Sequence, residues 1–158
     1  MTDPTTLSHL RRAIDVARSA REHGNHPFGA VLVDAGGRIV LEAENTVTTH
    51  RDATGHAETN LVRLASNQLD ADELAGATLV TSTEPCAMCS GAIYWAGIGA
   101  VVFGLSESGL LAMTGAHPEN PTLALPCREV FAAGGRDIRV TGPLLEDEAA
   151  TVHEGFWV

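Results

Sequence analysis

The sequence predicts an α/β domain with three layers (α-β-α), in which a five-stranded mixed sheet lies between helices. Five short apolar runs have the length of strands, and they alternate with segments whose apolar residues recur at helical spacing. A turn at Ala35-Gly36-Gly37 joins two of these runs into an antiparallel hairpin. A helical segment separates two later runs, near residues 80 and 102, which is typical of a parallel crossover. The two kinds of pairing together predict a mixed sheet.

The size and the charge of the chain restrict its organisation and its partners. Its 158 residues suffice for one domain with its own core, so we expect a single domain over residues 1–158. The formal net charge of −10 opposes binding to nucleic-acid phosphates, and the densest basic run is only Arg11-Arg12. We find neither a signal-peptide pattern nor an apolar run long enough to cross a bilayer, and therefore expect a cytoplasmic protein with no membrane partner.

The first quarter of the chain predicts a surface helix followed by the hairpin. Apolar residues recur at helical spacing over residues 7–22, and Asp3 or a threonine shortly after it can cap this helix. Gly24 ends the helix. The two strands of the hairpin follow over residues 30–33 and 38–43.

The middle of the chain predicts a long helix behind a polar loop. The polar segment 46–55 leads into a helix that begins at His56, with Thr54 or Gly55 as its N-cap. A buried strand over residues 78–81 comes next. Loops such as 46–55 often carry binding groups, so this segment is a candidate pocket wall.

A second helix and two more strands complete the predicted core. Pro85 suits the opening of a helix from residue 86 to about residue 96, and a strand over residues 100–104 follows it. We expect the segment 105–126 to be a long loop, which is typical of lids and functional insertions.

The end of the chain predicts smaller elements. A short helix around residues 128–132 precedes a fifth strand over residues 138–140. Residues 143–158 indicate a terminal helix and an aromatic tail.

Two short motifs supply a candidate metal site. His56 lies in His56-Ala57-Glu58, and the two cysteines lie in Pro85-Cys86-Ala87-Met88-Cys89. One nitrogen and two sulfur ligands suit a tetrahedral Zn²⁺, and three protein ligands leave its fourth position open, as in catalytic zinc sites. Cys86 and Cys89 are three residues apart at a helix start, so both sulfurs lie on one face, where the helix dipole stabilises thiolates.

Glu58 is the candidate catalytic proton carrier. It follows His56 by two residues, so its carboxylate can lie beside the metal rather than on it. Two thiolates neutralise Zn²⁺ and weaken its effect on the pKa of water, so a separate base is needed. Glu58 can accept that proton, pass it to a ring nitrogen and then protonate a leaving amine. The pattern predicts hydrolytic loss of an exocyclic amino group as ammonia.

Other interpretations of these residues stay open. Cys127 could close a structural zinc site as a fourth ligand, although it also suits a small buried core position. Cys86 and Cys89 could form a thioredoxin-like redox pair, which would leave His56 and Glu58 without a role. Phe28 and Trp95 suit either the core or stacking against a planar heterocycle.

The chain resembles the cytidine/deoxycytidylate deaminase superfamily, and most of all the small bacterial guanine deaminases. The resemblance covers nearly the whole chain and rests on four segments: residues 27–30, residues 45–49, residues 56–58 and residues 84–96. It implies a cytidine deaminase-like fold, a zinc ion and a homodimer. It also implies a free heterocyclic base as the small-molecule substrate. We expect guanine, which would be converted to xanthine and ammonia, to be the preferred base.

The resemblance assigns roles to individual residues. Zinc would be bound by His56, Cys86 and Cys89, and Glu58 would be catalytic. The substrate-binding residues would be Phe28, Asn45, Ala57, Trp95, Glu146 and Trp157. Among them, Asn45 would hydrogen-bond the base, and Phe28 and Trp95 would wall the pocket. The C-terminal segment 143–158 would be a lid, which in this family closes over the site of the other subunit.

The chain departs from the resemblance at one place. Bacterial guanine deaminases read the purine with an aspartate shortly after the fourth strand, whereas this chain has Glu107-Ser108-Gly109. A cytosine-like or amino-triazine base therefore stays open as the substrate. The superfamily also contains deaminases of the tRNA wobble adenosine, which the net charge and the missing basic C-terminal helix disfavour here.

Overall fold

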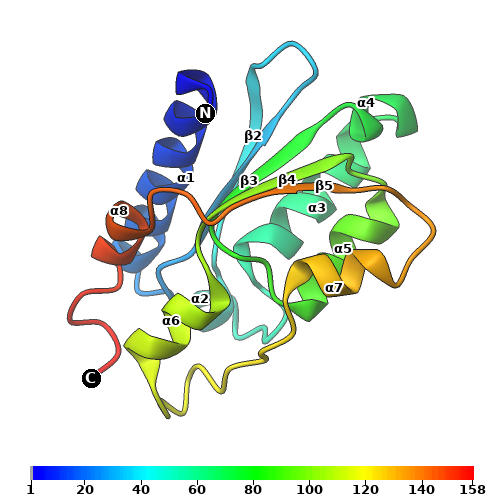
Figure 1. Cartoon of the computed structure of the whole chain (residues 1–158). Helices are drawn as coiled ribbons and strands as arrows, with labels where there is room; N and C mark the ends of the chain where they lie inside the picture. Colours follow the sequence, from blue (N-terminus) through cyan, green and yellow to red (C-terminus); the bar gives the residue numbers. More distant parts are fainter. Residues whose placement is uncertain (1) are drawn as a thin grey trace.

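A five-stranded sheet forms the centre of the computed structural model, which describes residues 2–158 (Figure 1). Its strands are β1 (Gly29–Val33), β2 (Ile39–Glu44), β3 (Thr78–Thr83), β4 (Ala100–Leu105) and β5 (Arg139–Thr141), in the spatial order β2-β1-β3-β4-β5. β1 pairs antiparallel with both β2 and β3, whereas β3 with β4 and β4 with β5 pair parallel. The predicted mixed sheet, its hairpin and its parallel crossover are confirmed.

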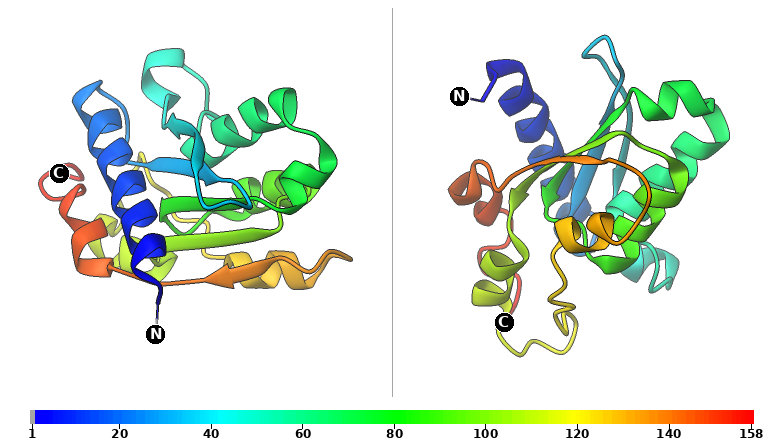
Figure 2. Two further views of the ribbon diagram at one scale, coloured as in Figure 1. Left: turned by 90° about the horizontal axis from the view of Figure 1, so that it is seen from above. Right: turned by 45° about the vertical axis from the view of Figure 1, so that its right-hand side comes forward.

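Helices cover both faces of this sheet. They are α1 (Pro4–Glu22), α2 (Val47–His50), α3 (Ala57–Gln68), α4 (Ala71–Ala75), α5 (Ala87–Ala96), α6 (Glu107–Thr114), α7 (Cys127–Ala132) and α8 (Glu146–Thr151). Helices α3, α5 and α7 pack on one face, and α1 and α8 pack on the other. Figure 2 shows from two further directions that α8 lies beside α1 although the two helices are at opposite ends of the chain. This arrangement is the predicted three-layer α-β-α fold.

The two hydrophobic cores explain why the central strands are apolar on both faces. Along β1, Leu32 packs with Leu61 of α3 and Ile93 of α5, whereas Val31 packs with Ile14 of α1. Successive side chains of a strand point to opposite faces, so a strand between two helix layers buries every residue. All five residues of β1 and all six of β4 are buried accordingly.

Gly29 allows α1 to cross β1 closely. A Cβ atom at this position would overlap the backbone of Ala17 on α1. The same residue donates its N–H to the Ser82 hydroxyl at 3.2 Å, which ties the start of β1 to β3. Phe28 therefore lies directly before the start of β1, an inner strand of the sheet.

The segment after β4 differs from the predicted long loop, because it contains α6. The Ser106 hydroxyl accepts the N–H of Gly109 at 3.1 Å and so caps this helix, while Leu110 is buried. The sequence did not predict α6, because its apolar residues do not form a clear stripe along one face of the helix. Residues 115–126 are irregular, as predicted for the whole segment.

Three other boundaries also differ from the predictions. The polar segment 46–55 contains the short helix α2, whose N–H groups at Thr48 and Thr49 bond to the side-chain oxygen of Asn25. His56 itself, not Thr54 or Gly55, is the N-cap of α3, because its backbone is still extended. The terminal helix, α8, ends at Thr151 and turns follow it. None of the helices within residues 2–158 combines the length and the apolar character that crossing a bilayer requires.

Candidate active site

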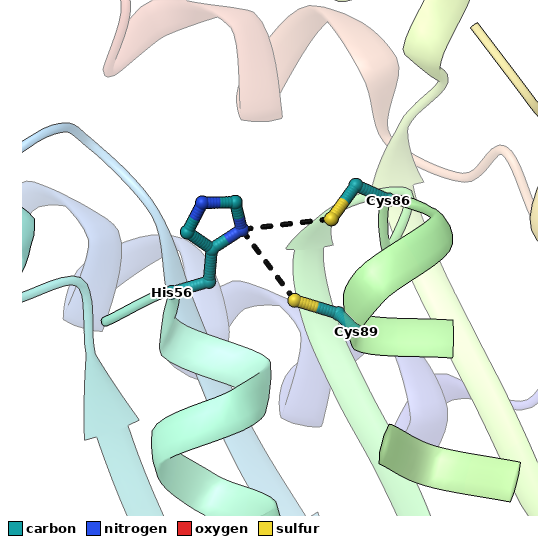
Figure 3. Close-up of side chains that lie close together, drawn as sticks. All are labelled: His56, Cys86 and Cys89. Atoms are coloured by element: carbon teal, nitrogen blue, oxygen red, sulfur yellow. Dashed lines mark hydrogen bonds between the residues drawn. The ribbon is translucent and has the colours of Figure 1, made fainter. Parts of the chain in front are cut away.

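The predicted zinc ligands converge from the starts of two helices (Figure 3). His56 and Cys86 are the N-cap residues of α3 and α5, and Cys89 lies in the first turn of α5. The His56 Nδ1 atom lies 3.6 Å from the Cys86 Sγ atom and 3.5 Å from the Cys89 Sγ atom. Zinc bonds of about 2.05 Å to nitrogen and about 2.3 Å to sulfur, at tetrahedral angles, place such atoms about 3.6 Å apart. The three side chains therefore fit the ion in both chemistry and spacing, and the predicted zinc site is confirmed.

The pKa values of the two thiols are shifted in opposite directions. Hydrogen bonds with Cys89 and His56 lower the pKa of Cys86 to about 4, whereas the hydrogen bond to Cys86 and burial raise the pKa of Cys89. The lowered pKa favours the thiolate form of Cys86, which is the form that binds a metal ion.

Cys127 is not part of this site. Among residues 2–158, the metal-binding cluster consists of His56, Cys86 and Cys89 alone. Cys127 is fully buried in the core under α7, where burial raises its pKa to about 12. Of the two roles considered for Cys127, the structure supports the small buried core residue and not the fourth ligand of a structural zinc site.

Glu58 lies in the first turn of α3 and is buried beside the metal-binding cluster. Its Oε1 atom accepts a hydrogen bond of 2.6 Å from the Thr81 hydroxyl on β3. Burial raises the pKa of Glu58, although the Thr81 bond works against this shift. A carboxyl group with raised proton affinity is suited to accept a proton and then return it.

A cavity of about 430 Å³ opens onto this cluster. The side chains of His56, Cys86 and Glu58 line one part of its wall, and Phe28 and Asn45 line another. Asn45 is buried and its Oδ1 atom accepts the N–H of Val47 at 3.0 Å, which leaves its Nδ2 atom as a donor for a ligand. The structure thus brings five of the predicted site residues to one cavity, which lies within the size range of small-molecule pockets.

The other four predicted substrate-binding residues do not line this cavity. Ala57 is fully buried in the core between two lining residues. Trp95 is 78% exposed. The N-terminus of α5 points at the site, and Trp95 lies near the other end of this helix, about 13 Å further along the helix axis. Glu146 bonds to the backbone and the hydroxyl of Ser106 at 3.2 and 3.0 Å and so braces the start of α6.

Trp157, the fourth, lies just behind the wall of the cavity of its own chain. Its Nε1 atom donates a hydrogen bond of 3.0 Å to the Nδ1 atom of His153. Its ring centroid lies 5.4 Å from that of His26 and 6.3 Å from that of Phe28, and both of these residues line the cavity. The tail therefore supports the pocket of the same subunit in this structure.

The structure also places in the wall residues that were not among the predicted substrate-binding residues. The segment 107–127 supplies Glu107, Leu110 and the run 119–123, and β3 and its following turn supply Thr83 and Glu84. Burial, with the nearby charges of Cys86, Glu84 and Glu58, raises the pKa of Glu107 to about 7. Two sequence signals pointed here: Glu107 stands where the resemblance places a purine-reading aspartate, and Glu84 directly precedes Pro85-Cys86.

Comparisons with known proteins agree with this chemistry. The family model described as the cytidine and deoxycytidylate deaminase zinc-binding region matches residues 4–105. A probable cytosine deaminase of Schizosaccharomyces pombe is 45% identical over 151 residues, which cover 96% of this chain and 91% of that protein. Guanine deaminase of Bacillus subtilis is 48% identical over 88 residues, and this match spans 55% of this chain and about half, 56%, of that enzyme.

A solved structure of guanine deaminase from Nitrosomonas europaea has the same fold. It superposes with a TM-score of 0.77 at 26% identity and covers 96% of this chain and 83% of its own.

Proposed function

The chain belongs to the zinc-binding cytidine and deoxycytidylate deaminase family. From this premise we propose that it deaminates a free nucleobase and that guanine is its preferred substrate. The observation that carries the proposal is the single cavity that joins the zinc-binding cluster, the buried carboxyl group of Glu58 and the amide of Asn45. A cavity of about 430 Å³ is large enough to hold a nucleobase.

The side chains around the cavity divide the reaction between them. Zinc, when bound by His56, Cys86 and Cys89, supplies the Lewis acidity that makes water a nucleophile at neutral pH. Glu58 takes a proton from the attacking water and passes it to the ring nitrogen next to the amino-bearing carbon. It then carries the second proton to the leaving amine, so that a C–O bond replaces the C–N bond and ammonia departs. Asn45 orients the base by hydrogen bonding, and the ring of Phe28 packs against it.

Guanine is favoured over other bases by the acidic lining of the pocket. The carboxyl groups of Glu107, Glu84 and Glu119 line the cavity together with Glu58. Guanine presents more N–H donors than cytosine. The carboxyl groups of Glu107 and Glu119 can accept them, whereas both oxygens of Glu84 already accept backbone N–H groups. Cytosine is the second candidate, because the Schizosaccharomyces pombe relative matches almost the full length of the chain. An amino-triazine presents the same amine beside a ring nitrogen and is the third.

Deamination of folded tRNA is the less favoured alternative. The net charge of −10 opposes the phosphate contacts that dominate RNA affinity. Native gel electrophoresis with tRNA at low and at high salt tests it: we expect free tRNA in both conditions, and salt-sensitive retention of tRNA would favour the alternative.

We also propose that the active protein is a homodimer. Trp95 is an aromatic residue that is 78% exposed at the end of α5, and its ring centroid lies 5.3 Å from that of Tyr94. Subunit contacts commonly bury such residues. Analytical ultracentrifugation of the wild-type chain and of Trp95→Ser tests this: a dimer that persists undiminished in the variant removes Trp95 from the interface.

The substrate is tested by measuring ammonia release from purified, zinc-loaded protein. The panel contains guanine, cytosine, adenine, amino-triazines and the corresponding nucleosides. We expect the highest kcat/KM with guanine and none above background with nucleosides. Preference for cytosine would support the second candidate, and inactivity towards every base would refute the proposed function.

A further inference from the structure

Glu84 is a buried carboxyl group that the proposed chemistry does not use. It lies at the end of β3, two residues before the zinc ligand Cys86, and is only 9% exposed. Its Oε1 atom accepts the backbone N–H of Glu107 at 3.1 Å, and its Oε2 atom accepts the backbone N–H of Cys127 at 3.0 Å. Both oxygens are therefore used by main-chain donors.

The two donors mark the two ends of one segment. Residues 107–127, which we call the cover segment, contain α6 and the irregular stretch that leads to α7. The cover segment supplies to the cavity wall Glu107, Leu110, Glu119, Asn120, Pro121, Thr122 and Leu123. One carboxylate thus ties both ends of the segment that walls the cavity to the turn that carries the zinc ligands.

Between the two ends, the buried side chain of Leu110 anchors α6 to the core, whereas the irregular stretch 115–126 has weaker attachments. The Oε1 atom of Glu119 lies 3.3 Å from the Nε2 atom of His26, and the Glu119 side chain is largely exposed. The Asn120 amide bonds to Thr114, which belongs to the same segment. The position of this stretch therefore depends largely on how the segment is held at its ends. Hydrogen bonds from main-chain amides to a buried carboxylate are stronger than neutral ones.

We propose that Glu84 is a positioning residue that holds the cover segment in register with the zinc-binding helix and so shapes the substrate pocket. The proposal rests on the proposed function. A carboxylate is suited to this role because it offers an acceptor to each end. A glutamine would keep one acceptor and set its NH₂ group against the other N–H.

Glu84→Gln is the first test. We expect one zinc per chain, a KM for the preferred base raised about tenfold, and a kcat within twofold of the wild-type value. In hydrogen-exchange measurements, the amides of Glu107 and Cys127 should exchange at least tenfold faster, while those of Val80 and Val102 in the sheet should not change. Asp34→Asn is the matched control, because Asp34 also accepts two backbone N–H groups, of Gly36 and Arg38, in the distant hairpin.

A second pair of variants removes one tie without touching Glu84. Cys127 is the first residue of α7, a position where proline is well tolerated, so Cys127→Pro deletes the N–H that Glu84 accepts. Cys127→Ala removes the thiol and keeps the N–H. We expect a raised KM in the proline variant and a wild-type KM in the alanine variant.

Three results would overturn the proposal. An unchanged KM in Glu84→Gln would do so, even with faster exchange, since the tie would then not shape the pocket. Loss of zinc in parallel with activity would show that Glu84 acts through the metal ligands. Equal KM values for the proline and alanine variants would exclude the tie at Cys127. If the wild-type chain deaminated no base, the proposed function would fail, while the exchange rates would still report on the tie.

Discussion

The Thr81 hydroxyl donates a hydrogen bond of 2.6 Å to Oε1 of Glu58, which lines the same cavity as the zinc ligands His56 and Cys86. Thr81 lies on β3 and is fully buried, whereas Glu58 lies in the first turn of α3. The bond therefore fixes the orientation of the proton carrier relative to the central sheet. Orientation matters because proton transfer requires hydrogen-bond distance to the atoms that react.

Replacing Thr81 by valine removes this hydrogen bond and keeps the shape of the side chain. We expect kcat to fall about ten- to a hundredfold, since a hydrogen bond to a charged group is worth about 1.5–3 kcal/mol. Zinc content should stay at the wild-type value. Steady-state kinetics with the preferred base are the measurement, and Thr81→Ser, which keeps the hydroxyl, should restore most of the rate. A valine variant with wild-type kcat would contradict the role of the bond.

Glu58→Gln should separate zinc binding from catalysis. The amide cannot carry protons, so we expect kcat to fall by a factor on the order of 10²–10⁴, while zinc content measured by atomic absorption remains unchanged. Glu148→Gln is the control, because Glu148 forms an exposed ion pair with Arg11. An active glutamine variant would refute the assignment of the proton carrier.

The carboxyl group of Glu107 should make substrate binding depend on pH near neutrality. Because its pKa is raised to about 7, chiefly by burial, it is protonated below that pH and ionised above it. The ionised form accepts hydrogen bonds from N–H groups of a base, so KM should fall as the pH rises from about 6 to about 8. We expect Glu107→Gln to abolish this trend and Glu119→Gln to retain it. A trend that survives in Glu107→Gln must arise from another group.

His153 should make the fold sensitive to acid. Burial, with the nearby charge of Arg21, lowers the pKa of His153 from 6.5 to about 4. The unfolded chain binds this proton more tightly than the folded chain, so stability is lost as the pH falls from about 6.5 to about 4, by about 3 kcal/mol. Urea unfolding at pH 7 and pH 4.5 measures the loss. It should be smaller in His153→Gln and unchanged in His50→Gln, whose side chain is exposed. Equal losses in both variants would exclude His153 as the cause.

The C-terminal tail should affect substrate binding more than turnover. Trp157 packs against His26 and Phe28, which line the cavity. Replacing Trp157 by alanine should therefore raise KM about three- to tenfold with little change in kcat. Removal of Val158 alone, which is 97% exposed, is the control and should have no effect. Unchanged kinetics in Trp157→Ala would limit the tail to a packing role.

Local patterns in the sequence were sufficient to predict the sheet and the zinc ligands. Strands between two helix layers must be apolar throughout, and a histidine and two cysteines at helix starts satisfy the spacing that zinc requires. These features depend on neighbours in the chain, so they can be read without knowing the packing. The same holds for Glu58, which is placed by its distance of two residues from His56.

The remainder of the pocket depends on contacts between distant segments, which no local pattern records. Glu107 and Glu119 reach the cavity because both ends of their segment bond to Glu84, and Thr81 meets Glu58 because α3 packs over β3. The resemblance assigned Trp95 and Glu146 to the substrate site, but both residues lie outside the cavity of this chain. Short sequence motifs were thus sufficient to predict the chemistry of the site, whereas the shape of the pocket is determined by how the layers and the cover segment pack together.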